Sequence, residues 1–128
     1  MSSFTDYTEA AVLNHVFRGI AMTSPGTVYL ALMTAAPNDT GGGTEVGAVG
    51  GYVRHAAAFD APVGNTISNT DLESWVAAGG NFGNIVAVGV FDALTGGNML
   101  SWTTITAALI NDNDEIKFNP GDIVVSLD

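Results

Sequence analysis

Apolar residues near the start of the chain recur with the period of an α-helix. They stand at i, i+3, i+4 and i+7 and so share one helical face: Leu13, Val16, Phe17 and Ile20. Thr5 or Asp6 suits the N-cap and Gly19 the C-terminal end, so the pattern predicts a helix over residues 7–18. One-faced helices usually pack on their own sheet, and we expect that here, with a neighbouring subunit as the alternative.

Most of the remaining chain has the short apolar runs and turn signals of β-strands. Residues 27–34 are apolar on both alternating faces, which predicts a central strand covered by a helix on one side and a second sheet on the other. Residues 84–91 repeat this buried pattern, and residues 99–104 follow as their hairpin partner. Further strands are predicted at 52–59, 66–68, 115–118 and 123–127, the last two paired across a Pro-Gly turn.

These elements predict a mainly β fold, an antiparallel β-sandwich of about seven strands with one N-terminal α-helix. A chain of 128 residues forms a single domain, here 1–128. Residues 69–81 fit either a helical turn or a strand followed by a loop. Residues 35–51 form a long Gly-rich loop, which is either a binding loop or a disordered surface loop. Its candidate contact residues are Thr44, Glu45 and Val46.

Charge is scarce and unbalanced in this chain. Only 12% of residues are charged, 47% are hydrophobic, and the formal net charge is −10. Such a surface suits a protein that other subunits partly cover. Arg18, Arg54 and Lys117 are too few for the basic face that nucleic-acid binding needs. We expect no membrane span and no secretory signal, and the lack of cysteine fits synthesis in a reducing compartment.

The sequence shows no catalytic constellation, so we expect no enzymatic activity, no cofactor and no catalytic or metal-binding residues. The two histidines, His15 and His55, are expected on the surface and in packing, respectively. Asp112, Asp114 and Glu115 form the densest acidic cluster. They do not fit the EF-hand register, and Asn/Asp-rich stretches also form plain turns, so the sequence leaves a metal at this turn undecided.

Several aromatic residues allow a rival hypothesis, a carbohydrate-binding module. Trp75, Trp102 and Tyr52 would supply its sugar-binding rings if they were exposed. Large aromatic side chains are more often core or interface anchors in a domain of this size, because their burial contributes strongly to stability.

Five segments occur in an order that resembles a known family: HVFRG, TSPGTVYLALMT, GGYVRHAAAF, VGVFDALTGGNML and NPGDIVVSLD. Together they resemble small virion structural proteins of tailed bacteriophages, which are often labelled tail fibre protein, while others are similar to capsid cement or decoration proteins. The resemblance covers nearly the whole chain, from about residue 7 to residue 128, and rests on the ordered set of segments.

The resemblance implies a structural protein without catalytic residues. It leads us to expect a capsid cement protein on the capsid exterior, made in the host cytoplasm, that bridges capsomers of the major capsid protein. Such a protein is expected to self-associate, as a homotrimer. A tail or tail-fibre component is the alternative, although the chain shows neither the repeats nor the fibrous composition of a fibre shaft. The candidate interface residues are the helix stripe and the three loop residues named above.

Overall fold

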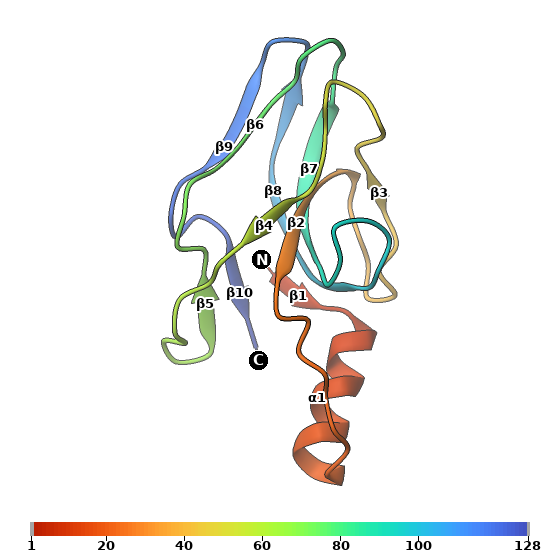
Figure 1. Cartoon of the computed structure of the whole chain (residues 1–128), viewed down its shortest axis with the longest axis vertical. Coiled ribbons are helices and arrows are strands. Elements are labelled where there is room, and N and C mark those ends of the chain that lie inside the picture. Colours follow the sequence, from red (N-terminus) through yellow and green to blue (C-terminus); the bar gives the residue numbers. More distant parts are fainter. Residues whose placement is uncertain (1, 128) are drawn as a thin grey trace.

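A computed structural model describes residues 2–127. Met1 and Asp128, the two ends of the predicted 1–128 domain, lie outside the described residues. Within these residues the chain forms one helix and ten strands (Figure 1). In chain order they are β1 (Ser2–Phe4), α1 (Asp6–Arg18), β2 (Val28–Ala35), β3 (Thr44–Glu45), β4 (His55–Ala57), β5 (Thr66–Ser68), β6 (Glu73–Val76), β7 (Gly83–Phe91), β8 (Met99–Ile110), β9 (Glu115–Phe118) and β10 (Val124–Ser126).

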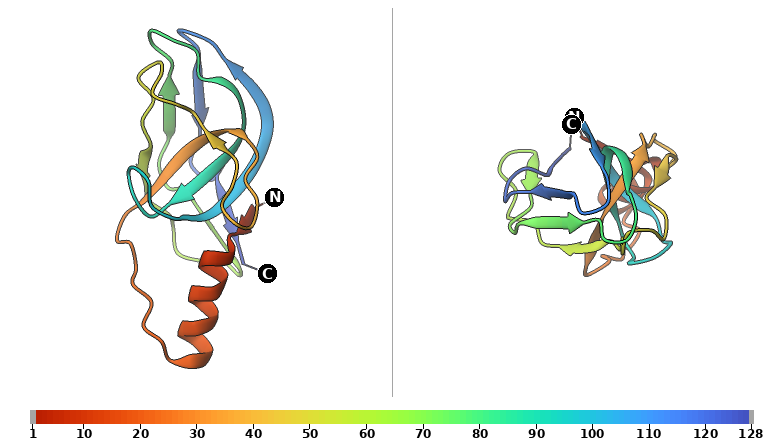
Figure 2. Two further views of the ribbon diagram at one scale, coloured as in Figure 1. Left: turned by 90° about the vertical axis from the view of Figure 1, so that its right-hand side faces the viewer. Right: turned by 90° about the horizontal axis from the view of Figure 1, so that it is seen from above.

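The main sheet has the strand order β1-β8-β7-β2-β3, and β4 also pairs with β2. Every pairing is antiparallel, with Leu30 of β2 opposite Val90 of β7 and Gly89 of β7 opposite Trp102 of β8. The central position of β2 explains its pattern of apolar residues on both faces. Two smaller antiparallel pairs, β6 with β9 and β5 with β10, form the second layer (Figure 2).

The main core lies between the two layers. It joins side chains from the main sheet to side chains from the second layer, and its buried members include Leu30, Leu32, Ile85, Val88, Trp75, Ile116, Phe118 and Val125. The predicted fold class, a mainly β antiparallel sandwich with one N-terminal helix, is confirmed. The strand count is higher than the expected seven, because β1 and β3 were not foreseen and residues 69–81 contain the strand β6.

The expected pairing of the last two strands is wrong, although the turn between them is correct. Asp122 N–H donates to the Asn119 carbonyl at 3.0 Å, and Gly121 has φ +88°. Buried Asn69 then separates the flanking strands: its carbonyl accepts from Gly121 N–H at 2.9 Å and its Oδ1 from Ile123 N–H at 2.8 Å. As a result β9 pairs with β6 and β10 pairs with β5.

The other face of the main sheet carries a second, smaller buried cluster of Ala31, Met33, Ala87, Phe91 and Met99. We expected a helix to cover this face, and that expectation is wrong. The Arg54 guanidinium lies 3.7 Å from the centroid of the Phe91 ring. A Cβ added at Gly41 would lie 3.7 Å from Cβ of Met99, so the Gly-rich segment also approaches the face. Loops therefore provide the cover.

The Gly-rich segment 35–51 is ordered rather than free of secondary structure. Its residues Thr44–Glu45 form β3 against β2, and Val46 is buried in the main core. The turn into β3 depends on Gly43, whose φ is +97°. A Cβ at this position would lie 2.7 Å from the Ala35 carbonyl oxygen. Both the backbone conformation and the close approach require glycine.

Replacing Gly43 with alanine is therefore expected to lower the free energy of unfolding by about 1–3 kcal/mol. The matched control is Gly47→Ala in the same segment, where an added Cβ meets nothing within 4 Å and no positive φ is present. The control should leave stability within about 0.5 kcal/mol of the parent chain. Urea denaturation followed by tryptophan fluorescence measures both, and equal effects would show that the turn is not strained by a side chain.

Candidate interaction surface

The helix α1 is joined to the sandwich through its first turn. Thr5, at the N-cap, makes no capping hydrogen bond with its side chain. Its hydroxyl instead donates to the Met99 carbonyl at 2.6 Å, and the hydroxyl of Thr8 donates to the Leu100 carbonyl at 2.7 Å. Asp6 N–H donates to a carbonyl of the Gly-rich segment at 2.7 Å. Two buried threonines thus fix the position and the angle of the helix relative to β8.

Beyond this turn the helix projects from the end of the sandwich (Figures 1 and 2). Thr8 is its one buried residue among those described. The predicted stripe, Leu13, Val16, Phe17 and Ile20, is exposed by 44–78%. The expectation that the stripe packs on the domain's own sheet is therefore wrong. Apolar periodicity shows that a helix has a face to bury, but it does not identify the partner.

The helix and the return segment 19–26 together form what we call the arm. Gly19 ends the helix in the left-handed conformation at φ +66°, as its position predicted. Ile20 N–H donates to the Asn14 carbonyl at 3.1 Å, and Arg18 Nη1 donates to Asn14 Oδ1 at 2.8 Å. His15 Nδ1 lies 3.1 Å from the Ile20 carbonyl oxygen, so this exposed histidine helps close the tip. The arm is therefore an ordered hairpin of helix and extended chain.

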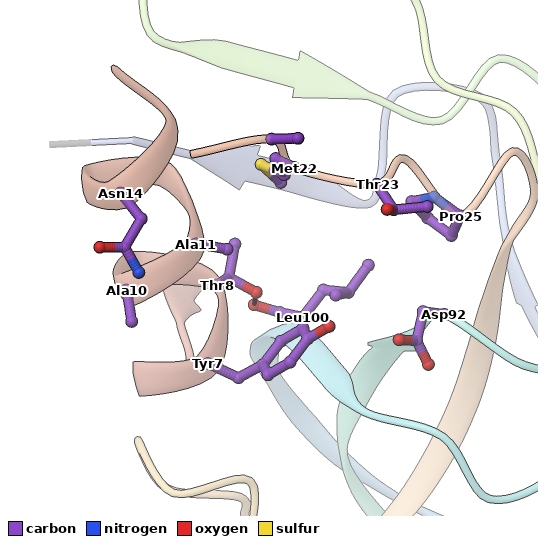
Figure 3. Close-up of a pocket in the computed structure, with 11 residues that line it drawn as sticks. Tyr7, Thr8, Ala10, Ala11, Asn14, Met22, Thr23, Pro25, Asp92 and Leu100 are labelled. Carbon is purple, nitrogen blue, oxygen red and sulfur yellow. Dashed lines mark hydrogen bonds between the residues drawn. The ribbon is translucent and has the colours of Figure 1, made fainter. Parts of the chain in front are cut away.

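A groove of about 580 Å³ lies between the arm and the sandwich (Figure 3). Small and apolar side chains dominate its lining, which is Tyr7, Thr8, Ala10, Ala11, Asn14, Ala21, Met22, Thr23, Pro25, Asp92 and Leu100. Its acidic member, Asp92, accepts hydrogen bonds from the backbone and side chain of Asn98 at 2.7 and 3.0 Å. These bonds lower the pKa of Asp92. The carboxylate is thus held in its ionised form as an acceptor for Asn98. The rest of the lining is mostly small and apolar, so the groove suits apolar contact.

The three predicted loop residues are divided between the surface and the interior. Thr44 is exposed, whereas Val46 belongs to the core. Glu45 forms a bidentate ion pair with buried Arg54, at 2.9 Å to Nε and 2.8 Å to Nη2, and accepts the Tyr52 hydroxyl at 2.6 Å. Burial alone would raise the pKa of Glu45, but these two partners outweigh burial and lower it. Glu45 and Val46 therefore act within the fold.

Arg54 links three separate segments, a role that no sequence pattern indicated. Besides Glu45, it donates from Nη1 to the carbonyls of Ala93 and Gly96, each at 2.8 Å. The residue is 8% exposed, so these contacts are shielded from water. The Gly-rich segment, the strand β4 region and the β7–β8 loop meet on this side chain.

The aromatic residues considered for sugar binding are buried or half-buried and make contacts within the fold. Trp75 is 3% exposed, and its Nε1 donates to the Val53 carbonyl at 2.9 Å. The half-buried His55 ring stacks on it, with centroids 4.2 Å apart, so the indole offers no free face to a sugar. The hydroxyl of Tyr52 is bonded to Glu45, and Trp102 is half-buried.

The acidic turn near residue 112 uses its carboxylates to close local structure. Asp112 accepts from Gly79 N–H at 2.8 Å and Asp114 from Asn111 N–H at 2.9 Å, while the Ser74 hydroxyl donates to Glu115 at 2.6 Å. Over residues 2–127 the structure contains no group of three or more His, Asp or Glu placed to bind a metal ion. The helix described in that range is too short and polar to cross a membrane.

Comparison with known families gives one match. A family model described as Podophage GP4 fiber I protein gp80 matches residues 3–126, which is almost the entire chain. A search of curated proteins found no match.

Proposed function

Because the chain belongs to the family of podophage GP4 fiber I protein gp80, a family of phage virion structural proteins, we propose that it is a fibre component of a phage virion that assembles through its arm. The name of the family supports the fibre assignment, and its match spans both the arm and the sandwich. The inference that the protein assembles through its arm rests on the observation that the arm projects from the sandwich.

The arm has the properties of an assembly contact. It presents three large apolar side chains on a helix whose base is fixed by Thr5 and Thr8, with Phe17 exposed by 78%, and a fourth, Ile20, on the return segment. Burying such a side chain contributes about 1.5–3 kcal/mol, and an ordered helix loses little further freedom when it docks. An exposed stripe of this kind marks a protein–protein contact.

A capsid cement protein is the second candidate, with the major capsid protein as partner and the capsid exterior as location. The observations that favour it are the absence of fibre-like repeats and the compact sandwich of residues 2–127. A cement protein would be present at many copies per virion and a fibre component at few, so the copy number separates the two candidates. The homotrimer expected from the sequence is retained as the proposed oligomer.

Cosedimentation with particles that lack the protein tests both candidates. The purified protein is mixed separately with such capsids and with isolated tails, and bound copies are counted. Saturable binding to tails at a few copies per particle is the expected result. Saturable binding to capsids at a copy number near one per capsomer contradicts the fibre assignment and establishes the cement role. Binding to neither overturns both.

The role of the arm is tested in the same assay with Phe17→Asp. Burial of a carboxylate in an apolar contact is costly, so we expect binding weaker by about 30-fold or more. The matched control is Leu94→Asp, which places the same charge on an apolar residue of the β7–β8 loop that is 51% exposed. Equal binding by Phe17→Asp and the parent chain would rule out the arm as a contact needed for assembly on the particle.

A further inference from the structure

We infer that the arm of one copy docks into an apolar groove lined by β1, β5 and β10 of a second copy, so that copies join head to tail. This inference rests on the proposal that the arm is an assembly contact, and it names the partner of that contact. The observations that carry it are the composition of the groove, the charge distribution along the chain, and the placement of arm and groove.

The second groove differs from the one beside the arm in being almost entirely apolar. It measures about 340 Å³ and is formed mainly by Phe4, Pro62, Ile67, Val125 and Leu127. Exposed apolar side chains continue beside it, with Val63 exposed by 77% and Leu127 by 50%. An open apolar groove with an apolar rim gains stability when an apolar side chain fills it.

Phe17 is the side chain best suited to fill this groove. It is exposed by 78%, the largest fraction among the large apolar residues described, and it lies near the tip of a projecting helix. Val16 precedes it on the helix and Ile20 follows on the return segment, and both are exposed and available to contact the rim. An aromatic side chain buries a large area in such a pocket, and aromatic anchors often dominate the energy of protein interfaces.

The charges of the chain favour contact between an arm and a body. The two acids of the arm, Asp6 and Glu9, lie in its first turn, and the outer part of the arm, residues 10–26, contains a single charged residue, Arg18, next to Phe17. The body, residues 27–128, contains eleven acidic residues against two basic ones, a net charge of −9. Asp60, which accepts from Ser68 N–H of β5 at 2.9 Å, places one of these acids beside the groove. Docking of the arm tip on a body brings opposite charges together, while tip-to-tip or body-to-body docking brings like charges together.

The placement of arm and groove favours a neighbouring copy. Figure 1 and the left view of Figure 2 show the arm at the same end of the sandwich as β5 and β10. In Figure 1 the arm lies below β1 and β2, whereas β5 lies at the opposite side of that end. The arm points away from the sandwich, so it meets the groove of another molecule. Such a contact uses two different surfaces and closes into a ring when the rotation between copies permits, which suits the proposed trimer.

The test is the oligomeric state of purified full-length protein, measured by sedimentation equilibrium. The arm variant is Phe17→Asp, the groove variant is Leu127→Asp, and Leu94→Asp is the control. We expect the parent chain and the control to form oligomers. Each of the other two should dissociate into monomers, with self-affinity at least about 30-fold weaker. Circular dichroism confirms that each variant is folded.

Mixing the two defective variants identifies the geometry of the contact. The arm variant keeps an intact groove and the groove variant keeps an intact arm, so a head-to-tail contact predicts a one-to-one heterodimer. A mixture that stays monomeric overturns the inference, as does a parent chain that is monomeric or a Phe17→Asp chain that still forms oligomers. Because no other virion component is present, these outcomes are independent of the cosedimentation assay, which tests the proposed function by itself.

Discussion

Replacing Arg54 with methionine is expected to lower the free energy of unfolding by about 3 kcal/mol. Methionine keeps much of the side-chain volume but leaves Glu45 without its ion pair. It also removes the donor from the Ala93 and Gly96 carbonyls. Breaking a buried pair by removing one partner costs about 3–5 kcal/mol, and the 25% exposure of the Glu45 side chain places this case at the lower end.

The matched control for Arg54 is the other arginine of the chain. Arg18 is exposed and bonds only to Asn14 among the described hydrogen bonds, so Arg18→Met should change stability by less than about 0.5 kcal/mol. Urea denaturation of both variants gives the comparison. A loss below about 1 kcal/mol for Arg54→Met would mean that the three segments are held in place by packing rather than by this side chain.

Trp75→Ala is expected to have the other large effect, a loss of about 3–5 kcal/mol in the free energy of unfolding. The indole fills the space between His55, stacked on it at 4.2 Å, and Phe118, whose ring packs edge-on at 6.1 Å. Alanine leaves a cavity at this point and frees the Val53 carbonyl from its donor. Calorimetry should show the loss as a reduced melting temperature.

Phe17→Ala serves as the control for Trp75→Ala because it removes an aromatic ring of similar size from the surface. At 78% exposure the ring contributes little to the folded monomer, so stability should change by less than about 0.5 kcal/mol when measured at a concentration where the chain is monomeric. Similar losses for the two variants would show that the arm packs against the sandwich in solution.

Local patterns in the sequence predicted the elements well where neighbouring residues decide the structure. The helix predicted at 7–18 is found at Asp6–Arg18, and the strands predicted at 66–68 and 115–118 are found at those positions. Each of these segments has a clear period and is bounded by turn or capping residues.

Strand partners could not be predicted in the same way, because they depend on residues far apart in the sequence. The Pro-Gly turn after β9 predicts a hairpin, and nothing local indicates that Asn69 will occupy the space between the two strands. The same limit applies to the Arg54 contacts, which join residues that are 9, 39 and 42 positions away. For the arm, the period identified which side chains share a face, but the exposure of that face depends on Thr5 and Thr8 fixing the helix away from the sheet.

The pairing of β1 with β8 and of β5 with β10 affects how the chain folds during synthesis. Ser3 pairs with Trp102, and Ile67 pairs with Val125. The strand β1 therefore cannot pair until β8 has been synthesised, and β5 cannot pair until β10 has been synthesised. Contacts this distant in sequence slow folding, and the sandwich can close only after β10 has been synthesised. A growing chain therefore exposes its arm early, whereas the β5–β10 groove is absent until residues 124–127 emerge from the ribosome.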